Sequence, residues 1–224
     1  FAERTKIMKK LICLTLIVTN LFTLTAFAER TALSQKQKED LYSLNIMTGD
    51  ENGDLHLDDN ITRAETVKML CVASGNISEN PDFSFPDVDK NHWALKYIAA
   101  AKESGIVSGD ENGRFNPESN VTNEEFVKMI VCLLGYGEMA NSQGGYPGGY
   151  AAVASRLKIT ENLKLTPNTY ATRNDVAIMM CIALDVPLMI AKQTDEAMEY
   201  FVADGNGGHE KITLRSRIIS QSEK

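Results

Sequence analysis

Two arginine residues stand at an unfavourable place for a helix. Arg63 follows Thr62 in the segment ITRAETVKML, and Arg173 follows Thr172 in ATRNDVAIMM. Threonine is a common N-cap, so each arginine is expected at the first helical position, where a cation opposes the helix dipole by about 0.3–1 kcal/mol. A guanidinium beside free helix-terminal amides can hold a carboxylate with two parallel bonds. The pattern predicts an anion site whose anion the folded chain does not supply, and little loss of stability when either arginine is removed.

The helices that would position these arginines carry their own start signal. A threonine followed three residues later by glutamate is a capping box, in which each residue accepts a bond from the other's backbone amide. At the second start Asn123 replaces the arginine, so its site is expected to be weaker or differently used. The capping pairs are Thr62 with Glu65, Thr122 with Glu125, and Thr172 with the shorter Asp175.

The three helix starts belong to three copies of one unit. The copies run on from Ile46, Ile106 and Leu157, and GDENG recurs unchanged at Gly49 and Gly109. Each copy reads as helix, loop and helix, and its second helix has more apolar surface than one copy can cover. This predicts a mainly α fold of three helix-loop-helix repeats that pack together around one shared core. The expected units span residues 29–84, 85–140 and 141–188.

Two further element predictions come from apolar spacing. In the second copy, Trp93, Tyr97 and Ala101 recur every four residues, which predicts a helix starting near residues 89–91 with these side chains on one stripe. Residues 189–224 are expected to be a linker or the start of a truncated β-rich domain. Residues 212–218 alternate between apolar and polar positions, which predicts a strand.

The first 28 residues are expected to be a removable export signal. Lys9 and Lys10 precede an apolar run that is short for a membrane span, and Ala26-Phe27-Ala28 is typical of a cleavage site. The segment has four basic side chains and one acidic one, so its loss changes the formal net charge from −7 to −10. An exported chain without stable membrane insertion is expected. An acidic chain without a basic tract disfavours nucleic acid as a partner.

The cysteines are expected to be buried core residues, not disulfide partners or metal ligands. Cys71, Cys132 and Cys181 are the three that remain after residue 28, and each lies inside an apolar helical run. An odd number argues against a fully paired disulfide framework, so all three are expected to be reduced and buried. No ligand spacing of cysteine or histidine predicts a metal site, and no cofactor motif occurs.

These motifs together resemble the S-layer homology family. The second copy supplies FPDV from Phe85, HWA around Trp93 and GIVSGDENGRFNP from Gly105, and the first copy supplies ITRAE. The resemblance implies a spindle of three units, which is a pseudo-threefold bundle whose grooves between neighbouring units bind secondary cell-wall polysaccharide, often carrying pyruvate ketals. Such a chain would anchor an exported bacterial surface protein non-covalently at the cell wall or S-layer, with S-layer self-assembly expected of a region beyond residue 224. The groove residues implied are Arg63, Arg173, Trp93, Asp87 and Gly109.

Two alternative functions stay open at the level of sequence. DENGDLHLDD from Asp50 alternates acidic and neutral residues, as a calcium module would, but an EF-hand needs glycine and glutamate where Leu55 and Ile61 stand. The other alternative is the anchoring part of a secreted enzyme whose catalytic domain lies beyond residue 224. Within the chain itself no nucleophile, zinc or phosphate-loop motif occurs, so it is not expected to be an enzyme.

Overall fold

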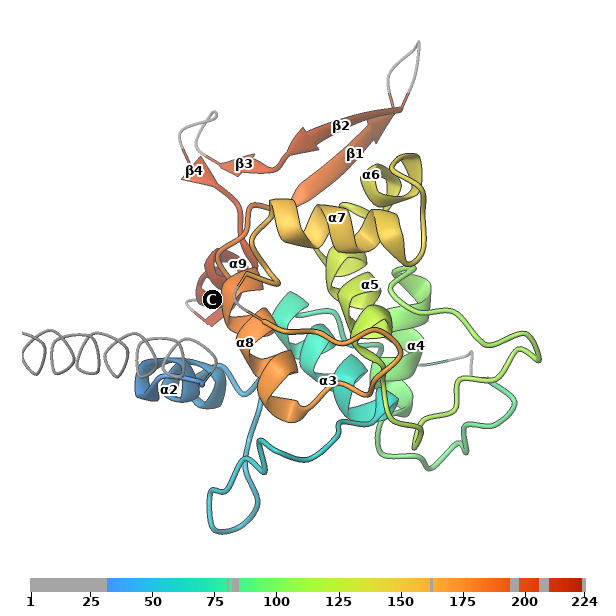
Figure 1. Cartoon of the computed structure of the whole chain (residues 1–224), viewed down its shortest axis with the longest axis vertical. Helices are drawn as coiled ribbons and strands as arrows, with labels where there is room; N and C mark the ends of the chain where they lie inside the picture. The colour runs from blue at the N-terminus through green and yellow to red at the C-terminus, as the bar shows by residue number, and fades with distance from the viewer. Residues whose placement is uncertain are drawn as a thin grey trace, which may run out of the picture.

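The computed structural model describes residues 32–79, 81, 85–161, 163–193, 198–205 and 210–222. The chain is mainly helical, as predicted, with short strands only near its described C-terminal part (Figure 1). The expected export signal, residues 1–28, lies outside the described residues. Among the described residues, no helix combines the length and apolar character needed to cross a membrane. The elements are α2 (Gln35–Ser43), α3 (Arg63–Ser74), α4 (Leu95–Glu103), α5 (Asn123–Leu133), α6 (Gly137–Ser142), α7 (Gly148–Arg156), α8 (Arg173–Ala183), β1 (Met189–Gln193), β2 (Met198–Val202), β3 (Asp204–Gly205), β4 (Glu210–Lys211) and α9 (Leu214–Ser222).

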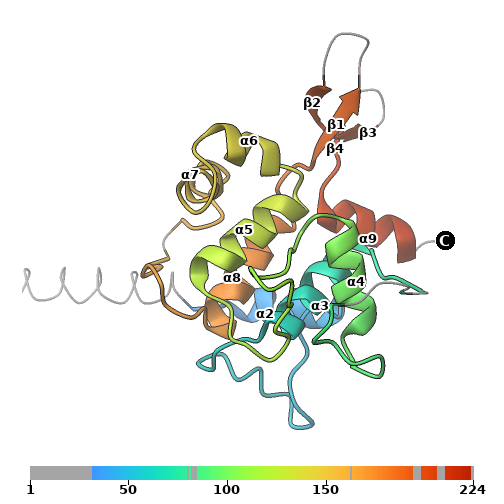
Figure 2. The same ribbon diagram turned by 90° about the vertical axis from the view of Figure 1, so that its right-hand side faces the viewer.

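Three capped helices form the centre of the molecule. Helices α3, α5 and α8 begin directly after Thr62, Thr122 and Thr172, and each threonine side chain accepts a bond from the amide three residues later. The glutamates at Glu65 and Glu125 complete a capping box in α3 and α5. Helix α5 packs against both α3 and α8, and the three lie together in both views (Figures 1 and 2).

The residues before these helices join the three units in a closed ring. The amide of Ile61 donates to the carbonyl of Ala171 (3.3 Å), Ala171 donates to Val121 (2.8 Å), and Val121 donates back to Ile61 (3.0 Å). All three side chains are fully buried. Because each strand-like segment contributes one donor and one acceptor, the ring satisfies backbone groups that would otherwise be buried without partners. This ring is the centre of the pseudo-threefold arrangement that the resemblance implies.

The outer helices interlock the units. Each one packs on the central helix of a different unit: α4 on α3, α7 on α5 and α2 on α8. The buried side chains of all three units consequently belong to one hydrophobic cluster. A single unit has neither the ring nor the covering helix, which accounts for the shared core expected from the apolar second helices.

Each outer helix ends in the same way. A residue with positive φ closes the helix, and a buried isoleucine follows it. The second unit uses Gly105 for this left-handed position, while the other units use ordinary residues, which is consistent with φ values near +60° being costly but accessible. The three pairs are Asn45 with Ile46, Gly105 with Ile106, and Lys158 with Ile159.

Two sequence-based predictions in the second unit need correction. Helix α4 begins at Leu95, later than predicted, because the preceding residues form turns, and Trp93 before it is 53% exposed instead of lying on the apolar stripe. Cys71 and Cys181 are buried as expected, but Cys132 is only partly buried. Its sulfur lies 4.0 Å from the hydroxyl oxygen of Tyr150 on α7.

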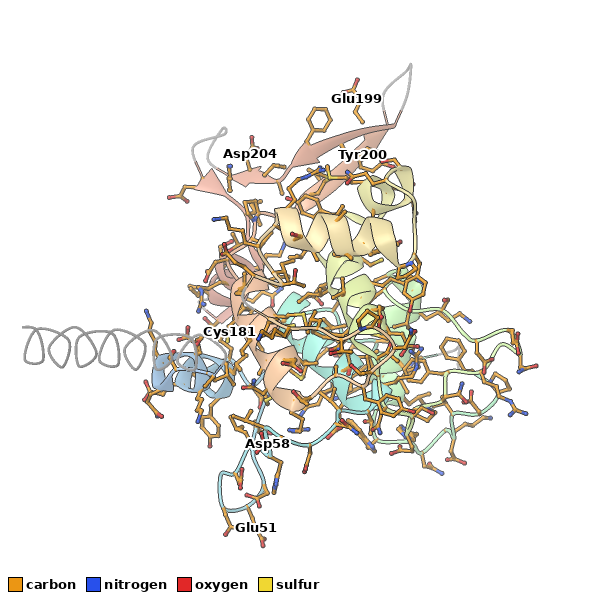
Figure 3. The ribbon with its side chains drawn as sticks, viewed as in Figure 1. Glu51, Asp58, Cys181, Glu199, Tyr200 and Asp204 are labelled. Carbon is orange, nitrogen blue, oxygen red and sulfur yellow. The ribbon has the colours of Figure 1, made fainter. Side chains whose placement is uncertain are left out.

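The C-terminal segment contains both strands and a helix. Strands β1 and β2 form an antiparallel hairpin that projects beyond the helices, with Glu199 and Tyr200 on it (Figures 2 and 3). The strand predicted over residues 212–218 is wrong, because helix α9 begins at Leu214. The amide of Ser216 donates to the hydroxyl of Thr213, and the amide of Thr213 donates to the hydroxyl of Ser216. This reciprocal cap starts a helix despite the alternating pattern.

Helix α9 returns to the first and third units. Leu214 is buried, and the Arg215 side chain forms ion pairs with Asp185 (2.7 Å) and with Asp40 on α2 (3.2 Å). The helix itself packs against α3. Helix α9, residues 214–222, thus packs against the folded bundle.

Candidate functional site

Arg63 links the first unit to the second. Its Nε donates to the carbonyl of Phe115 (2.8 Å), and its Nη1 lies 3.3 Å from a carboxylate oxygen of Glu125. The guanidinium carbon also stands 4.9 Å from the centre of the Phe115 ring, within cation–π range. Only 12% of the side chain is exposed. Burial lowers the pKa of Arg63, and the charge of Glu125 opposes that shift, so the guanidinium stays protonated.

Arg173 links the third unit to the first with the same geometry. Its Nε donates to the carbonyl of Leu55 (2.8 Å), and its Nη1 donates to Glu65 (2.8 Å). The side chain is 15% exposed. Leu55 and Phe115 occupy the same place in their loops, and Glu65 and Glu125 are the capping glutamates of their helices. The capping box and the arginine therefore form one repeated device between units.

This geometry overturns the reason given for the arginines from sequence alone. The prediction that the folded chain supplies no partner is wrong, since each arginine has a carbonyl and a carboxylate from the neighbouring unit. Those partners are more than fifty residues away in sequence, so no local pattern reveals them. The second expectation, that removing an arginine leaves stability almost unchanged, depended on that prediction and no longer holds. Removal would leave a buried carbonyl without a donor.

Asn123 takes the arginine position at the third junction. Its Nδ2 donates to the hydroxyl of Thr169 (2.9 Å) and to the carbonyl of Thr166 (3.3 Å), both in the third unit. The residue is 5% exposed. The shorter side chain keeps a bond across the junction but brings no charge to it.

A groove of about 290 Å³ opens beside Arg63; we name it groove 1. Basic and acidic side chains meet an exposed aromatic ring there. Lys128 lies one turn beyond Glu125 on α5, and its Nζ is 5.7 Å from the centre of the Tyr146 ring, which is 51% exposed. Groove 1 is lined by Arg63, Ile106, Val107, Ser108, Gly109, Asp110, Arg114, Asn116, Ser119, Asn120, Glu125, Lys128, Met129 and Tyr146.

A matching groove lies beside Arg173; we name it groove 2. It consists of two adjoining hollows, of about 180 and 370 Å³, which share Thr48, Glu65 and Arg173. Trp93 provides the exposed aromatic ring and stacks on His92 with ring centres 5.7 Å apart. The first hollow is lined by Ile46, Met47, Thr48, Glu65, Lys68, Met69, Trp93 and Arg173.

The two grooves agree position by position. Lys68 and Lys128 each stand six residues after their cap threonine, and Trp93 and Tyr146 each stand directly before the N-cap of an outer helix. Sequence reasoning identified Arg63, Arg173, Trp93 and Gly109, but missed both lysines and the tyrosine. The lysines could have been found from the spacing shared by ITRAETVK and VTNEEFVK. The tyrosine could have been found from its place in the third copy.

The third junction lacks these features. Ile178 stands where the other units have lysine, and Asn123 where they have arginine. Leu33 precedes the N-cap of α2 and is buried, so it offers no exposed ring. Two of the three junctions therefore present a pair of basic side chains beside an aromatic ring.

Of the predicted groove residues, Asp87 lies outside groove 1 and Gly109 lies in its wall. Asp87 accepts bonds from the amides of Phe115 (2.9 Å) and Asn116 (2.6 Å), so it fixes the loop whose carbonyl receives Arg63, and it does not line groove 1. Gly109 does line groove 1. A Cβ there would lie 2.9 Å from the backbone of Gly113, so the tight turn requires glycine.

The acidic turns of the first two units are held by their own aspartates. Asp50 accepts bonds from the amides of Asn52 and Asp54, and Asp110 accepts bonds from Asn112 and Arg114. These bonds lower the pKa of Asp50 and of Asp110. Among the described residues, no three acidic, histidine or cysteine side chains gather as they would around a metal ion. Figure 3 shows Glu51 and Asp58 on the projecting loop of the first unit.

Comparison with known proteins places this architecture in a family. Residues 84–127, which span the second unit from the start of its leading turn into α5, match the S-layer homology domain. The chain belongs to the S-layer homology family. The first and third units repeat the threonine-capped central helix of the matched segment.

The relatives of this S-layer homology chain are much longer proteins. A cell surface protein of Thermoanaerobacter kivui is 29% identical over 66% of this chain and 20% of its own length. A middle cell wall protein of Brevibacillus brevis is 34% identical over 69% of this chain and 15% of its own. An endoglucanase of a Bacillus species is 35% identical over 48% of this chain and 11% of its own. The chain spans a fifth or less of these relatives, and it is a module of the cell surface.

Proposed function

We propose that this chain anchors an exported protein non-covalently to the cell wall by holding an anionic wall polysaccharide in grooves 1 and 2. The observation that carries the proposal is the repetition of one set of side chains at two junctions. Each groove combines an arginine, a lysine and an exposed aromatic ring from three different elements. A fold that needs the arginine alone for packing would not need the lysine and the exposed ring beside it.

The arginine is prepared for an anion by its structural bonds. Arg63 uses Nε and Nη1 for protein partners, and within the described residues no partner is found for its Nη2. A carboxylate entering groove 1 would accept from this remaining donor and from Lys128 nearby. Because the guanidinium is already held in place, little side-chain entropy is lost on binding.

The walls of the grooves suit a sugar that carries a small acidic substituent. Tyr146 and Trp93 present flat faces on which the C–H face of a pyranose can lie. Val107 and Met129 add an apolar wall beside the cations of groove 1. A pyruvate ketal has one carboxylate and one methyl group on the same carbon, and it would meet both kinds of wall. In this proposal the chain acts by binding, and any catalytic or assembly function belongs to other parts of a longer protein.

The test is binding to purified cell-wall sacculi by the double variant Lys68→Ala/Lys128→Ala. Neither lysine takes part in the bonds that join the units, so the melting temperature should stay within about 2 °C of the parent. Loss of a charge-assisted contact in each groove should weaken binding about tenfold or more. Trp93→Ala/Tyr146→Ala should weaken it similarly.

The matched control is Lys36→Ala, which removes the same charge from an exposed position on α2 outside the grooves. Binding by the lysine double variant that equals the parent's would overturn the proposal. Sacculi treated with mild acid to remove ketals test the finer assignment, since the proposal expects the treated wall to retain much less protein.

A further inference from the structure

Grooves 1 and 2 contain loops that align residue by residue. Residues 49–60 and 109–120 begin with the same GDENG turn and lie sixty positions apart throughout. His56 and Asn116 occupy one aligned position, and both have positive φ. Each of these side chains approaches a carboxylate oxygen of the aspartate in its own turn, to 3.3 and 2.9 Å. The two loops therefore share their turn geometry, and the grooves differ mainly in the charges that the loops present.

Two aligned positions differ in charge between the loops. Asp54 in groove 2 stands where Arg114 stands in groove 1, and Asp59 stands where Ser119 stands. All four residues are exposed, and each of them lines its groove. The first position thus exchanges a cation for an anion, and the second exchanges a neutral hydroxyl for a carboxylate.

The second of these positions adjoins the groove arginine. The carbonyl of Ser119 accepts a bond from the amide of Arg63 (2.9 Å), and the carbonyl of Asp59 accepts one from the amide of Arg173 (2.8 Å). The Asp59 side chain is 74% exposed. An anion that approaches Arg173 therefore meets a carboxylate that has no counterpart at this position beside Arg63.

The two grooves consequently differ in the sign of their charge. Groove 1 is lined by three basic side chains and two carboxylates, which gives a formal charge of +1. Groove 2 is lined by two basic side chains and four carboxylates, which gives −2 with its histidine neutral. A ligand inside a groove lies within a Debye length of about 8 Å of the side chains around it, so salt screens these charges only in part. The charged groups are Arg63, Arg114, Lys128, Asp110 and Glu125 in groove 1, and Lys68, Arg173, Asp50, Asp54, Asp59 and Glu65 in groove 2.

We propose that groove 1 is selective for the acidic sugar of the polymer, and that groove 2 holds an uncharged sugar unit at least as readily as an acidic one. The inference rests on the proposed polysaccharide function and divides that function between the grooves. Both grooves keep the arginine, the lysine and the aromatic ring, so both can hold a sugar. Asp54 and Asp59 repel a carboxylate from groove 2, whereas Arg114 adds a third cation to groove 1. These two aligned positions determine the specificity of each groove.

The test is an NMR titration of the full chain, labelled at its methionine methyl groups, with a methyl glycoside that carries a 4,6-pyruvate ketal. Met129 lines groove 1, and Met69 stands at the aligned place in groove 2, so each methyl group reports on one groove. The Met129 signal should reach half-saturation at a ketal concentration about tenfold or more below that for Met69, as expected for the gain or loss of one charge-assisted contact. The same glycoside without the ketal should not favour groove 1. Raising the salt to 1 M should narrow the difference for the ketal, since the Debye length falls to about 3 Å.

Variants that exchange the charges provide the matched controls. Asp54→Arg/Asp59→Ser gives groove 2 the formal charge of groove 1, so it should tighten ketal binding at Met69 about tenfold and leave Met129 unchanged. Arg114→Asp should weaken ketal binding at Met129 by a similar factor and leave Met69 unchanged. The substituted residues are exposed, and if the double variant does not fold, Arg114→Asp decides alone.

The outcomes separate this inference from the function on which it rests. If both methyl groups saturate at the same ketal concentration, or Met69 saturates first, the division between the grooves is wrong and the proposed polysaccharide function stands. Ketal binding that Arg114→Asp leaves unchanged at Met129 would also overturn the division. If neither methyl group responds to either glycoside, the proposed function fails, and this inference fails with it.

Discussion

Replacing Arg63 by alanine should destabilise the chain, although a helix-dipole argument predicts the opposite sign. The variant loses the charge-assisted bond to the Phe115 carbonyl, worth about 1.5–3 kcal/mol because the acceptor stays buried. The contact with the partly exposed Glu125 adds at most about 1 kcal/mol. Relief of the unfavourable dipole interaction returns about 0.3–1 kcal/mol. The net loss should be about 2 kcal/mol, within a range of about 0.5–3.7 kcal/mol.

Thermal unfolding followed by circular dichroism measures this loss. For a chain of this size, 1 kcal/mol corresponds to about 2–4 °C, so the central loss of about 2 kcal/mol should make Arg63→Ala melt about 4–8 °C below the parent. Arg114→Ala is the matched control, because Arg114 lines the same groove but is exposed. It should change the melting temperature by about 2 °C at most. If both variants melt like the parent, the inter-unit bonds of Arg63 do not stabilise the fold, and the reasoning fails.

Two further predictions concern the acidic turns and the cysteines. Backbone amides, that of Arg114 foremost, lower the pKa of Asp110, so the carboxylate stabilises its turn above the ordinary value of 3.8 and this stabilisation is lost as pH falls below that value. The protection factor of the Asn112 amide, which is its exchange rate relative to the intrinsic rate at each pH, should fall only in that acidic range, and Asp110→Asn should remove the dependence. Burial raises the pKa of Cys71 and of Cys181 to about 12, so both stay protonated thiols at neutral pH. Native-state alkylation mapped by mass spectrometry should modify the partly exposed Cys132 first, and faster labelling of Cys71 would contradict its burial.

Local signals in the sequence were sufficient for the helix starts. A capping box involves residues three positions apart, so Thr62 with Glu65 and Thr122 with Glu125 could be recognised without tertiary information. The repeat itself predicted a shared core, because three similar helix starts with excess apolar surface need one another for cover, while the pseudo-threefold arrangement came from the family resemblance. The helix α9 was missed for a related reason. Its cap pairs Thr213 with a serine, and Leu214 gains its burial only from distant units.

Contacts between units could not be read from local spacing. Glu125 looks like a capping residue and nothing more, yet it also receives Arg63 from a helix 62 positions earlier. Trp93 fits an apolar stripe by spacing, but the backbone turns before α4 and leaves its ring at the groove. Tyr146 was missed because the equivalent positions hold different aromatic residues, and only the shared place before the outer helix makes the likeness visible.

Because the units interlock, all three are needed to complete the groove in which we propose that the polysaccharide binds. Groove 1 takes Arg63 from the first unit, Gly109 and Lys128 from the second, and Tyr146 from the third. Residues 84–127, which match the family by themselves, therefore lack parts of both grooves. They also lack two of the three segments that close the backbone ring. Folding is consequently a property of the three units together, and so is the polysaccharide binding that we propose, because the same bonds that join neighbouring units hold each arginine at its groove.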